Sequence, residues 1–393
     1  MDQETYDRGD IESDRGHSRD YDYDYTQDER YYNDRELRKQ RQSGGCCSWT
    51  KAAVFLFFIG IALGILFGLV NIDEIKSWFG NVMEGNSESD TDSGDQVFSF
   101  NQCTDVNATC CNGLHSNCDM SLNEVLFASV HNANHDSNLA PNNDAPLEQA
   151  LQAGYRGLLL DVCKCDDVIT FCHGICERGN RNPEEVFNNI GIFLSQNPHD
   201  VIILNFEMSV GEPTPEELWN VMETTSIKSK TYTYEGGPWP TFNDMIGMAT
   251  KKQVVAFYHN GPDCPLNNSP VTTGCHPRLI NYHDYVVETP WDFDKVSALQ
   301  NSETSCAENR GSSGSKDFYA INNFVTGSLG ASKTYAKIVN GNSFIGQHIT
   351  DCETLTSHQA NLVAVDFWTV GDLLEVTQDV NKARAAAKRS RNQ

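Results

Sequence analysis

The feature that most constrains this chain is a long apolar run near its N-terminus. Residues 52–70 read AAVFLFFIGIALGILFGLV and carry no charged side chain. At about 1.5 Å per residue, a helix of this length crosses a hydrocarbon core of about 30 Å. The run lacks the polar face of a soluble helix, and the fifty-one residues before it are too many for the leader of a cleaved signal peptide. We therefore expect an uncleaved transmembrane signal anchor.

The charges on either side of this run predict its orientation. Between Arg30 and Lys51 there are six basic side chains and two acidic ones, whereas Asp73 and Glu74 come first on the other side. The positively charged flank of a membrane span stays in the cytoplasm. We therefore expect a single-pass protein with a cytoplasmic N-terminus and an extracellular or lumenal C-terminal part.

Most of the fourteen cysteines follow the apolar run, twelve of them in all. An even number at this density is typical of disulfides formed in an oxidising compartment, and no His/Cys quartet has zinc-finger spacing. Proximity in the sequence suggests two pairs, Cys111 with Cys118 and Cys172 with Cys176. The other pairings are left open.

Four further residues carry modification signals on the two sides of the expected membrane. Cys46 and Cys47 lie just before the span, where paired cysteines are palmitoylation candidates, although two free thiols are an equal alternative. Asn107 and Asn267 each begin an Asn-x-Ser/Thr acceptor, and glycosylation at either requires the extracellular or lumenal side.

Composition divides the chain into a tail, a span, a stem and one globular part. Residues 1–51 are rich in Asp, Arg and Tyr with few aliphatic side chains, which predicts a disordered cytoplasmic tail. Residues 71–96 end in GNSESDTDSGDQ and form an acidic linker, and residues 97–393 have globular texture. The formal net charge of −25 excludes nucleic acid as a partner, because binding phosphates requires a basic face.

Short apolar runs alternate with helical patterns in the globular part, which predicts an α/β fold. The expected strands are 125–130, 157–162, 168–172, 201–206, 253–258 and 361–367, and the expected helices are 183–196, 215–223 and 371–388. Alternation over about 290 residues favours a TIM-like (β/α) barrel. A doubly wound sheet is the alternative, but no glycine-rich phosphate turn follows an early strand.

Polar side chains follow these strands where each one ends. They are His131, Asn132, Asp161, His173, Glu207 and Asp366. In a parallel barrel the carboxyl ends of the strands converge on one mouth, where active sites lie. A single histidine or carboxylate is more often structural, but the repeated placement after strands predicts a shared pocket.

The motifs in this order resemble a known family. They are SVHNA, GYRGLLLDV, FCHG and NPHDVIILNFE, with CCNGLHSNC before them and PWPTFNDMI, QVVAFY and NLVAVDFWTVGDL after them. Together they resemble the X region of phosphatidylinositol-specific phospholipase C, and even more the PLC-like phosphodiesterases of plants, fungi and algae. The resemblance covers roughly residues 103–387.

The resemblance implies cleavage of a phosphodiester by two histidines. His131 matches the general base that takes a proton from the attacking hydroxyl, and His173 matches the residue that protonates the leaving alcohol. Histidine suits both tasks because its pKa lies near neutrality. Asp366 is the candidate to orient His131.

The resemblance also implies a calcium site made of Asn132, Asp161 and Glu207, with Mg²⁺ as the less suitable cation. Two positions depart from the family. Leu159 stands where calcium-dependent members have a glutamate, and Cys163 stands where metal-independent bacterial members have an arginine. Three protein groups, completed by water and phosphate, would then hold the cation.

The sequence thus predicts a membrane-anchored phosphodiesterase acting on phosphatidylinositol or a glycolipid. Because the domain faces away from the cytoplasm, its phospholipid or glycolipid substrate is expected on the opposite leaflet. Two alternatives remain: a glycerophosphodiester phosphodiesterase, or a non-catalytic surface protein that binds lipid or glycan on the same barrel.

Overall fold

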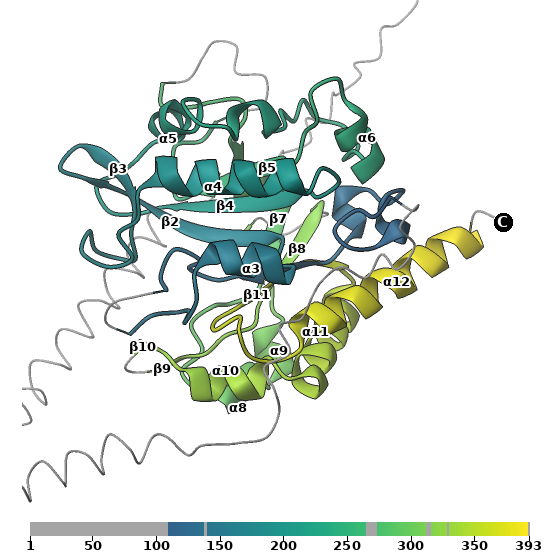
Figure 1. Cartoon of the computed structure of the whole chain (residues 1–393). Coiled ribbons are helices and arrows are strands. Elements are labelled where there is room, and N and C mark those ends of the chain that lie inside the picture. Colours follow the sequence, from purple (N-terminus) through teal and green to yellow (C-terminus); the bar gives the residue numbers. More distant parts are fainter. Residues whose placement is uncertain (1–108, 137–139, 265–272, 312–315, 328–329, 392–393) are drawn as a thin grey trace, which may run out of the picture. The chain divides into compact units, whose positions relative to one another are not determined.

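Figure 1 shows a computed structural model of the chain, which describes residues 109–391 apart from 137–139, 265–272, 312–315 and 328–329. The chain divides into two units, residues 1–95 and 96–393, and every described residue lies in the second. The expected tail, anchor and stem therefore lie outside the described residues. Within the described part, no helix is long and apolar enough to cross a membrane.

The described unit alternates strands and helices along the sequence. Its strands are β1 (Phe127–Val130), β2 (Gly157–Cys165), β3 (Val168–Phe171), β4 (Ile202–Met208), β5 (Val254–His259), β6 (Ile280–Asn281), β7 (Val286–Glu288), β8 (Phe318–Asn322), β9 (Thr326–Gly327), β10 (Gly330–Ala331) and β11 (Ala360–Val365). Its α-helices are α3 (Leu147–Ala153), α4 (Pro183–Gln196), α5 (Pro215–Met222), α6 (Phe242–Gly247), α7 (Tyr282–Tyr285), α8 (Val296–Leu299), α9 (Ser302–Ser305), α10 (Lys333–Val339), α11 (Asn342–Thr356) and α12 (Leu373–Arg391). Three short 3₁₀ turns are His115–Asn117, Leu122–Glu124 and Lys228–Lys230.

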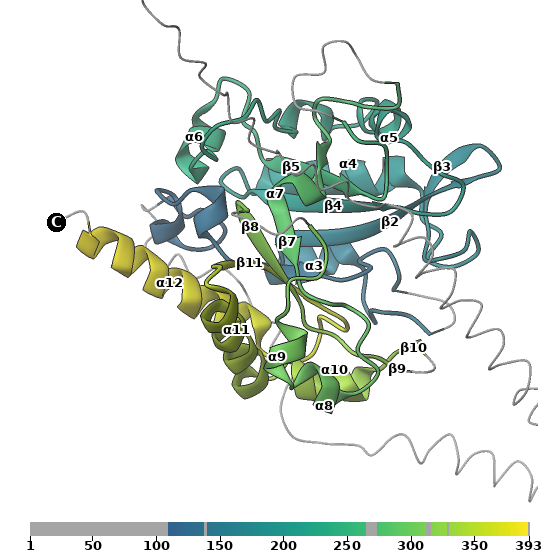
Figure 2. The same cartoon turned by 180° about the vertical axis from the view of Figure 1, so that it is seen from behind.

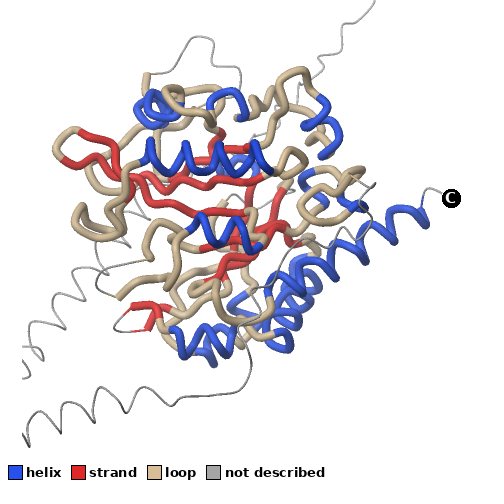
Figure 3. The backbone as a smooth tube through the Cα atoms, viewed as in Figure 1, coloured by secondary structure: helices blue, strands red, loops and turns tan. Residues whose placement is uncertain are grey.

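Eight strands form a parallel sheet in the order β6-β5-β4-β2-β1-β11-β8-β7. Within the described residues β6 and β7 are the two ends of this path, so the expected barrel is an open one. Figure 2 shows β7 and β8 from behind, and Figure 3 shows helices on the outside of the curved strands. β3 pairs antiparallel with β2 and leaves the path.

The two faces of the sheet bury different side chains, as the period of two along a strand requires. One face packs against helices; Leu204 on β4 belongs to the same apolar cluster as Ile190 on α4. The other face turns inward. Phe257 on β5 and Phe318 on β8 are not on neighbouring strands, yet their ring centroids are 5.8 Å apart. This contact across the interior shows that the sheet curves around a packed core.

Local sequence explains how β2 and α4 fit this core. Gly157 begins β2 because a Cβ at this position would lie 2.1 Å from the Ser129 hydroxyl on β1. α4 begins at Pro183, whose fixed φ suits the first helical turn. The side chain of Asn182 accepts a hydrogen bond from the Glu184 amide at 2.9 Å and caps the helix.

The disulfides only partly follow the expected pattern. Cys111 pairs with Cys118, as proximity suggested. The expected bond between Cys172 and Cys176 is wrong, because Cys172 pairs with Cys163 and Cys176 pairs with Cys165. The β2–β3 hairpin sets these partners: Cys163 lies opposite Thr170 in the ladder, which brings Cys172 close to it. Two further bonds join Cys264 to Cys275 and Cys306 to Cys352.

Candidate active site

Polar side chains occupy the carboxyl end of the inward face of the sheet. Along β4 the inward residues are Ile203, Asn205 and Glu207, and the other strands change from apolar to polar in the same way. The last inward residues of the barrel, together with those that directly follow the strands, are His131, Asp161, Glu207, His259, Glu288, Asn322 and Asp366. Sequence reasoning missed His259, Glu288 and Asn322, because their strands were predicted too short or not at all.

His131 and Asp366 form the first histidine–carboxylate pair. Nδ1 of His131 lies 2.8 Å from Oδ1 of Asp366, whose side chain is 4% exposed. The same oxygen accepts a hydrogen bond from Nδ2 of Asn142 at 2.9 Å. Because the carboxylate only accepts, Nδ1 of His131 carries the proton and Nε2 is left as a basic nitrogen.

An aromatic ring covers one face of His131. The ring of Phe324 lies parallel to the imidazole, with centroids 3.8 Å apart and an interplanar angle of 6°. Phe324 follows β8 and is buried, while the His131 side chain stays 19% exposed. This contact and the bond to Asp366 together restrict the rotation of the imidazole.

His173 and Asp161 form the second pair, with Nδ1 of His173 3.3 Å from Oδ2 of Asp161. The strand that places His173 at the mouth runs in a different direction from the one expected. Strand 168–172 was expected to be parallel, but β3 runs antiparallel to β2 and places Phe171 opposite Val162. The Cys172 amide then donates to the Asp161 carbonyl at 3.1 Å. The hairpin therefore returns His173 to the level of Asp161.

A third histidine links the two pairs, and it was not singled out from the sequence. The ring of His135 stacks on that of His173, with centroids 4.5 Å apart. Nδ1 of His135 lies 2.8 Å from Oδ1 of Asn142, the residue that also donates to Asp366. Burial lowers the pKa of His135, so it is neutral at neutral pH. Asn142 and His135 thus connect the surroundings of His131 to those of His173.

Glu207 lies between Asp161 and His259 in the sheet register. Partial desolvation and the negative charge of Asp161 raise the pKa of Glu207 to about 7. Asn260 donates to Oε1 of Glu207 at 3.2 Å, and Nε2 of His259 lies 3.8 Å from Oε2. Burial and the charge of Arg310 lower the pKa of His259 well below its ordinary value, so His259 adds no positive charge here.

Arg310 supplies a positive charge that the sequence did not reveal. Its Nε lies 2.5 Å from Oε1 of Glu288, and the backbones of the two residues bridge at the end of β7. Its charge also acts on Glu207, whose pKa it lowers against the effect of Asp161. Arg310 belongs to no sequence motif, so only the structure brings it to the mouth.

The three residues expected to bind a cation, Asn132, Asp161 and Glu207, offer oxygen atoms of the kind that a hard cation prefers. Nδ2 of Asn132 donates to Asn142 at 3.3 Å, which leaves its Oδ1 as an acceptor. Desolvation raises the pKa of Glu207 most and repulsion from Asp161 adds to it, and a cation between these carboxylates would relieve that repulsion. Cys163 is bonded to Cys172 and offers no positive charge. Asn132, Asp161 and Glu207 therefore fit a hard divalent cation.

The modification residues Cys46, Cys47, Asn107 and Asn267 lie outside the described residues. Their palmitoylation and glycosylation stay predictions. At the mouth itself, two histidines are each hydrogen-bonded to a carboxylate, and an imidazole can both accept and donate a proton. The site is thus equipped for general acid–base catalysis.

Comparisons with known proteins identify the family of this chain. The family model described as PI-PLC X 1 matches residues 117–381. The PI-PLC X domain-containing protein 1 of Arthroderma benhamiae is 25% identical over 291 residues, which are 69% of this chain and 89% of that protein. The chain belongs to the PI-PLC X family, and this membership supports a phospholipase C-like phosphodiesterase.

Two solved structures are among the similar ones. The phosphatidylinositol-specific phospholipase C of Staphylococcus aureus has a TM-score of 0.49 and 17% identity, covering 66% of this chain and 93% of that chain. The corresponding enzyme of Listeria monocytogenes has a TM-score of 0.47 and 16% identity, covering 67% of this chain and 94% of that chain.

Proposed function

We propose that this protein is a phosphoric diester hydrolase that cleaves a phosphatidylinositol- or glycolipid-type phosphodiester with His131 and His173 as base and acid. The observation that carries the proposal is the pair of histidine–carboxylate contacts, His131 with Asp366 and His173 with Asp161, at one mouth of the barrel. Membership in the PI-PLC X family supports it independently.

The first step is an internal attack on phosphorus. Nε2 of His131 takes the proton of the hydroxyl next to the phosphate, in an inositol lipid the 2-hydroxyl. Its oxygen forms a bond to phosphorus and closes a cyclic phosphate. Asp366 accepts the hydrogen bond from Nδ1 of His131 and stabilises the imidazolium that results.

The bond from phosphorus to the diacylglycerol oxygen breaks in the same step. A protonated His173 donates its proton to that oxygen, so the leaving group departs as a neutral alcohol. Asp161 accepts the hydrogen bond from Nδ1 of His173 and holds its ring in place. Water can then open the cyclic phosphate, with His173 as base and His131 as acid.

Calcium is the cation that Asn132, Asp161 and Glu207 suit best, since Mg²⁺ demands stricter octahedral geometry. When bound there, calcium would neutralise charge on the non-bridging phosphoryl oxygens. We further propose that residues 52–70 anchor the chain with its N-terminus in the cytoplasm. The site then meets lipids of the extracellular or lumenal leaflet, such as phosphatidylinositol or glycolipid anchors.

The experiment uses the full chain in detergent with calcium and mixed micelles of phosphatidylinositol. Phosphorus NMR of the water-soluble products should show cyclic inositol phosphate for the wild type and none for His131→Ala. His358→Ala is the control, because His358 pairs with Glu308 and belongs to neither histidine–carboxylate pair.

Three other outcomes are informative. Release of glycerophosphate from a glycerophosphodiester, without action on phosphatidylinositol, would contradict the proposal and support the first alternative. Vesicle binding without any turnover would support the non-catalytic alternative. Equal activity of wild type and His131→Ala would contradict the assigned mechanism.

A further inference from the structure

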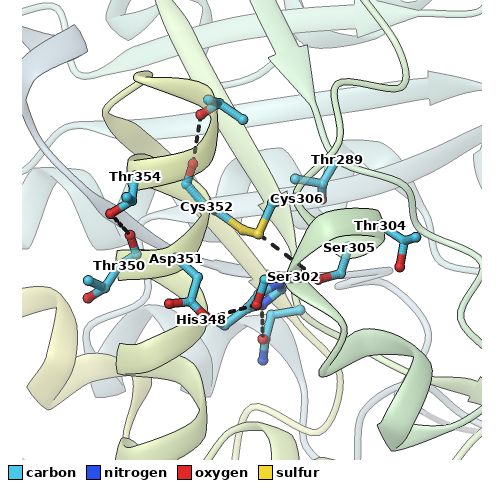
Figure 4. Close-up of a disulfide and its surroundings, with 12 residues drawn as sticks. Thr289, Ser302, Thr304, Ser305, Cys306, His348, Thr350, Asp351, Cys352 and Thr354 are labelled. Carbon is cyan, nitrogen blue, oxygen red and sulfur yellow. Dashed lines mark hydrogen bonds between the residues drawn. A yellow bond between two sulfur atoms is a disulfide. The ribbon is translucent and has the colours of Figure 1, made fainter.

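A chain of buried contacts begins at Ser305 and His348 and reaches the proposed base through the ring of Phe324. Figure 4 shows its outer part, where His348 on α11 faces Ser305 at the end of α9. Nε2 of His348 lies 3.0 Å from the Ser305 hydroxyl, and its Nδ1 lies 2.8 Å from Oδ1 of Asn323. Both histidine nitrogens therefore have partners, and none of these residues is exposed.

The protons in this chain have one consistent arrangement. Nδ2 of Asn323 donates to the Val339 carbonyl at 2.9 Å, which fixes Oδ1 as the atom that faces His348. Because Oδ1 only accepts, Nδ1 of His348 carries the proton and Nε2 accepts from Ser305. Burial lowers the pKa of His348 to about 4, so the ring is neutral at neutral pH.

The Cys306–Cys352 disulfide holds the outer end of this chain in place. Cys306 follows Ser305, and Cys352 lies one turn after His348 on α11, so the bond joins α9 to α11 at this contact. The sulfurs and a His348 nitrogen lie within 4.8 Å of one another, a grouping typical of a metal site. Since both sulfurs are consumed in the bond, the grouping serves to clamp Ser305 against His348.

The inner end of the chain reaches His131 through Phe324. Asn323 directly follows β8, and its amide donates to the Ala364 carbonyl on β11 at 2.8 Å. The next residue, Phe324, lies flat on the His131 ring at 3.8 Å. The orientation of the Asn323 side chain therefore affects the position of the Phe324 ring, which covers His131.

We propose that His348 is a positioning residue for the reaction: its hydrogen bond to Asn323 holds Phe324 against His131, so that Nε2 of His131 faces the substrate. The inference rests on the proposed role of His131 as base. A base that is free to turn spends less time aligned with the hydroxyl, and small misplacements of reacting groups cost large factors in rate. His348 itself touches no substrate.

Two variants of His348 separate positioning from simple packing. His348→Asn places an amide nitrogen where histidine has Nδ1 and can still donate to Asn323. His348→Gln places its amide nearer to the position of Nε2, so it can contact Ser305 but loses the bond to Asn323. We expect His348→Asn to keep most of the wild-type kcat and His348→Gln to lose about tenfold, with KM unchanged in both.

Phe324→Leu tests the inner end of the chain directly. It removes the stacked ring and keeps apolar bulk, so kcat should fall about tenfold without a change in KM. Ile349→Val is the matched control, because Ile349 is buried on the same helix but takes no part in the chain. This control should keep wild-type kcat whatever its effect on the unfolding temperature.

A second readout does not depend on turnover. In the full chain labelled with ¹⁵N-histidine, the His131 ring should be protonated at Nδ1 in the wild type and in His348→Asn. In His348→Gln and Phe324→Leu, the His131 ring should appear as a mixture of two tautomers, one protonated at Nδ1 and the other at Nε2. Identical His131 signals in all variants, or equal losses of kcat in His348→Asn and His348→Gln, would overturn the proposal. A wild type without turnover would contradict only the proposed function, because the ring signals would still decide this inference.

Discussion

Oδ1 of Asp366 lies 2.8 Å from Nδ1 of His131, although the two residues are 235 positions apart in the sequence. The contact forms because β11 pairs in parallel with β1, with Val365 opposite Val130, so the residues that follow these strands meet at the mouth. Parallel pairing of β1 and β11, the first and last of the described strands, thus assembles one half of the proposed catalytic machinery.

Asp366→Asn should lower kcat by about 100- to 10,000-fold and leave KM nearly unchanged. Asparagine can keep an oxygen toward His131 and place its amide nitrogen at Oδ2, a buried atom without a partner in the described part of the chain. The hydrogen bond from Nδ1 of His131 is therefore retained, but the negative charge that stabilises the imidazolium is lost. Steady-state kinetics with phosphatidylinositol, together with circular dichroism as the folding control, checks this prediction. An unchanged kcat would contradict the role of Asp366.

Glu207 should make the protein less stable as pH rises through neutrality when no metal is present. Its pKa is raised to about 7 in the folded state, while an unfolded glutamate titrates near 4.3. The folded state therefore binds more protons between these values, and stability is lost as pH rises between them. Thermal unfolding in EDTA at pH 5 and pH 8 should show a smaller loss for Glu207→Gln than for wild type. Equal losses in both proteins would contradict this assignment.

Calcium should offset the loss of stability that Glu207 causes at high pH. It should also bind more weakly in acid. A cation between Asp161 and Glu207 offsets their repulsion, so calcium should raise the unfolding temperature of wild type at pH 8 more than that of Glu207→Gln. Protonation of Glu207 removes a ligand, so calorimetric affinity should fall as pH drops below about 7. Equal affinities at pH 6 and pH 8 would remove Glu207 from the calcium site.

Removing the Cys306–Cys352 bond should destabilise the fold more than removing the Cys111–Cys118 bond. The first closes a sequence separation of 46 residues and the second one of 7. Loop entropy assigns about 4 kcal/mol to the longer loop and about 2.5 kcal/mol to the shorter. Urea unfolding of the two double-serine variants measures the difference. A larger loss for the Cys111–Cys118 variant would show that local contacts outweigh loop entropy.

The sequence predicted some of the long elements well, but it missed the fifteen-residue α11 and the five-residue β8. α4 begins and ends at the expected residues, 183 and 196, because Pro183 and the Asn182 cap mark its start. The six predicted strands coincide with described strands within a few residues. β6 and β7 were missed because two and three residues are too short to show any periodicity.

The sequence located polar residues at the mouth where they lie at the end of a long strand, as with Glu207 near the end of β4, and their functional roles stay predictions. Residues delivered by turns were missed. His135 and Asn142 lie in the loop after β1, and Arg310 reaches the mouth through a backbone bridge to Glu288. Such contacts depend on tertiary packing, so no spacing in the sequence predicts them.

The most direct test of the two-histidine mechanism compares two leaving groups. An alkyl alcohol must receive a proton as it departs, whereas nitrophenolate departs without one. His173→Ala should therefore lose at least about 1,000-fold in kcat/KM on phosphatidylinositol and far less on the nitrophenyl ester of inositol phosphate. His131→Ala should lose similar factors on both, because both substrates need the base. Equal losses of His173→Ala on the two substrates, or full activity of His131→Ala on either, would contradict the account.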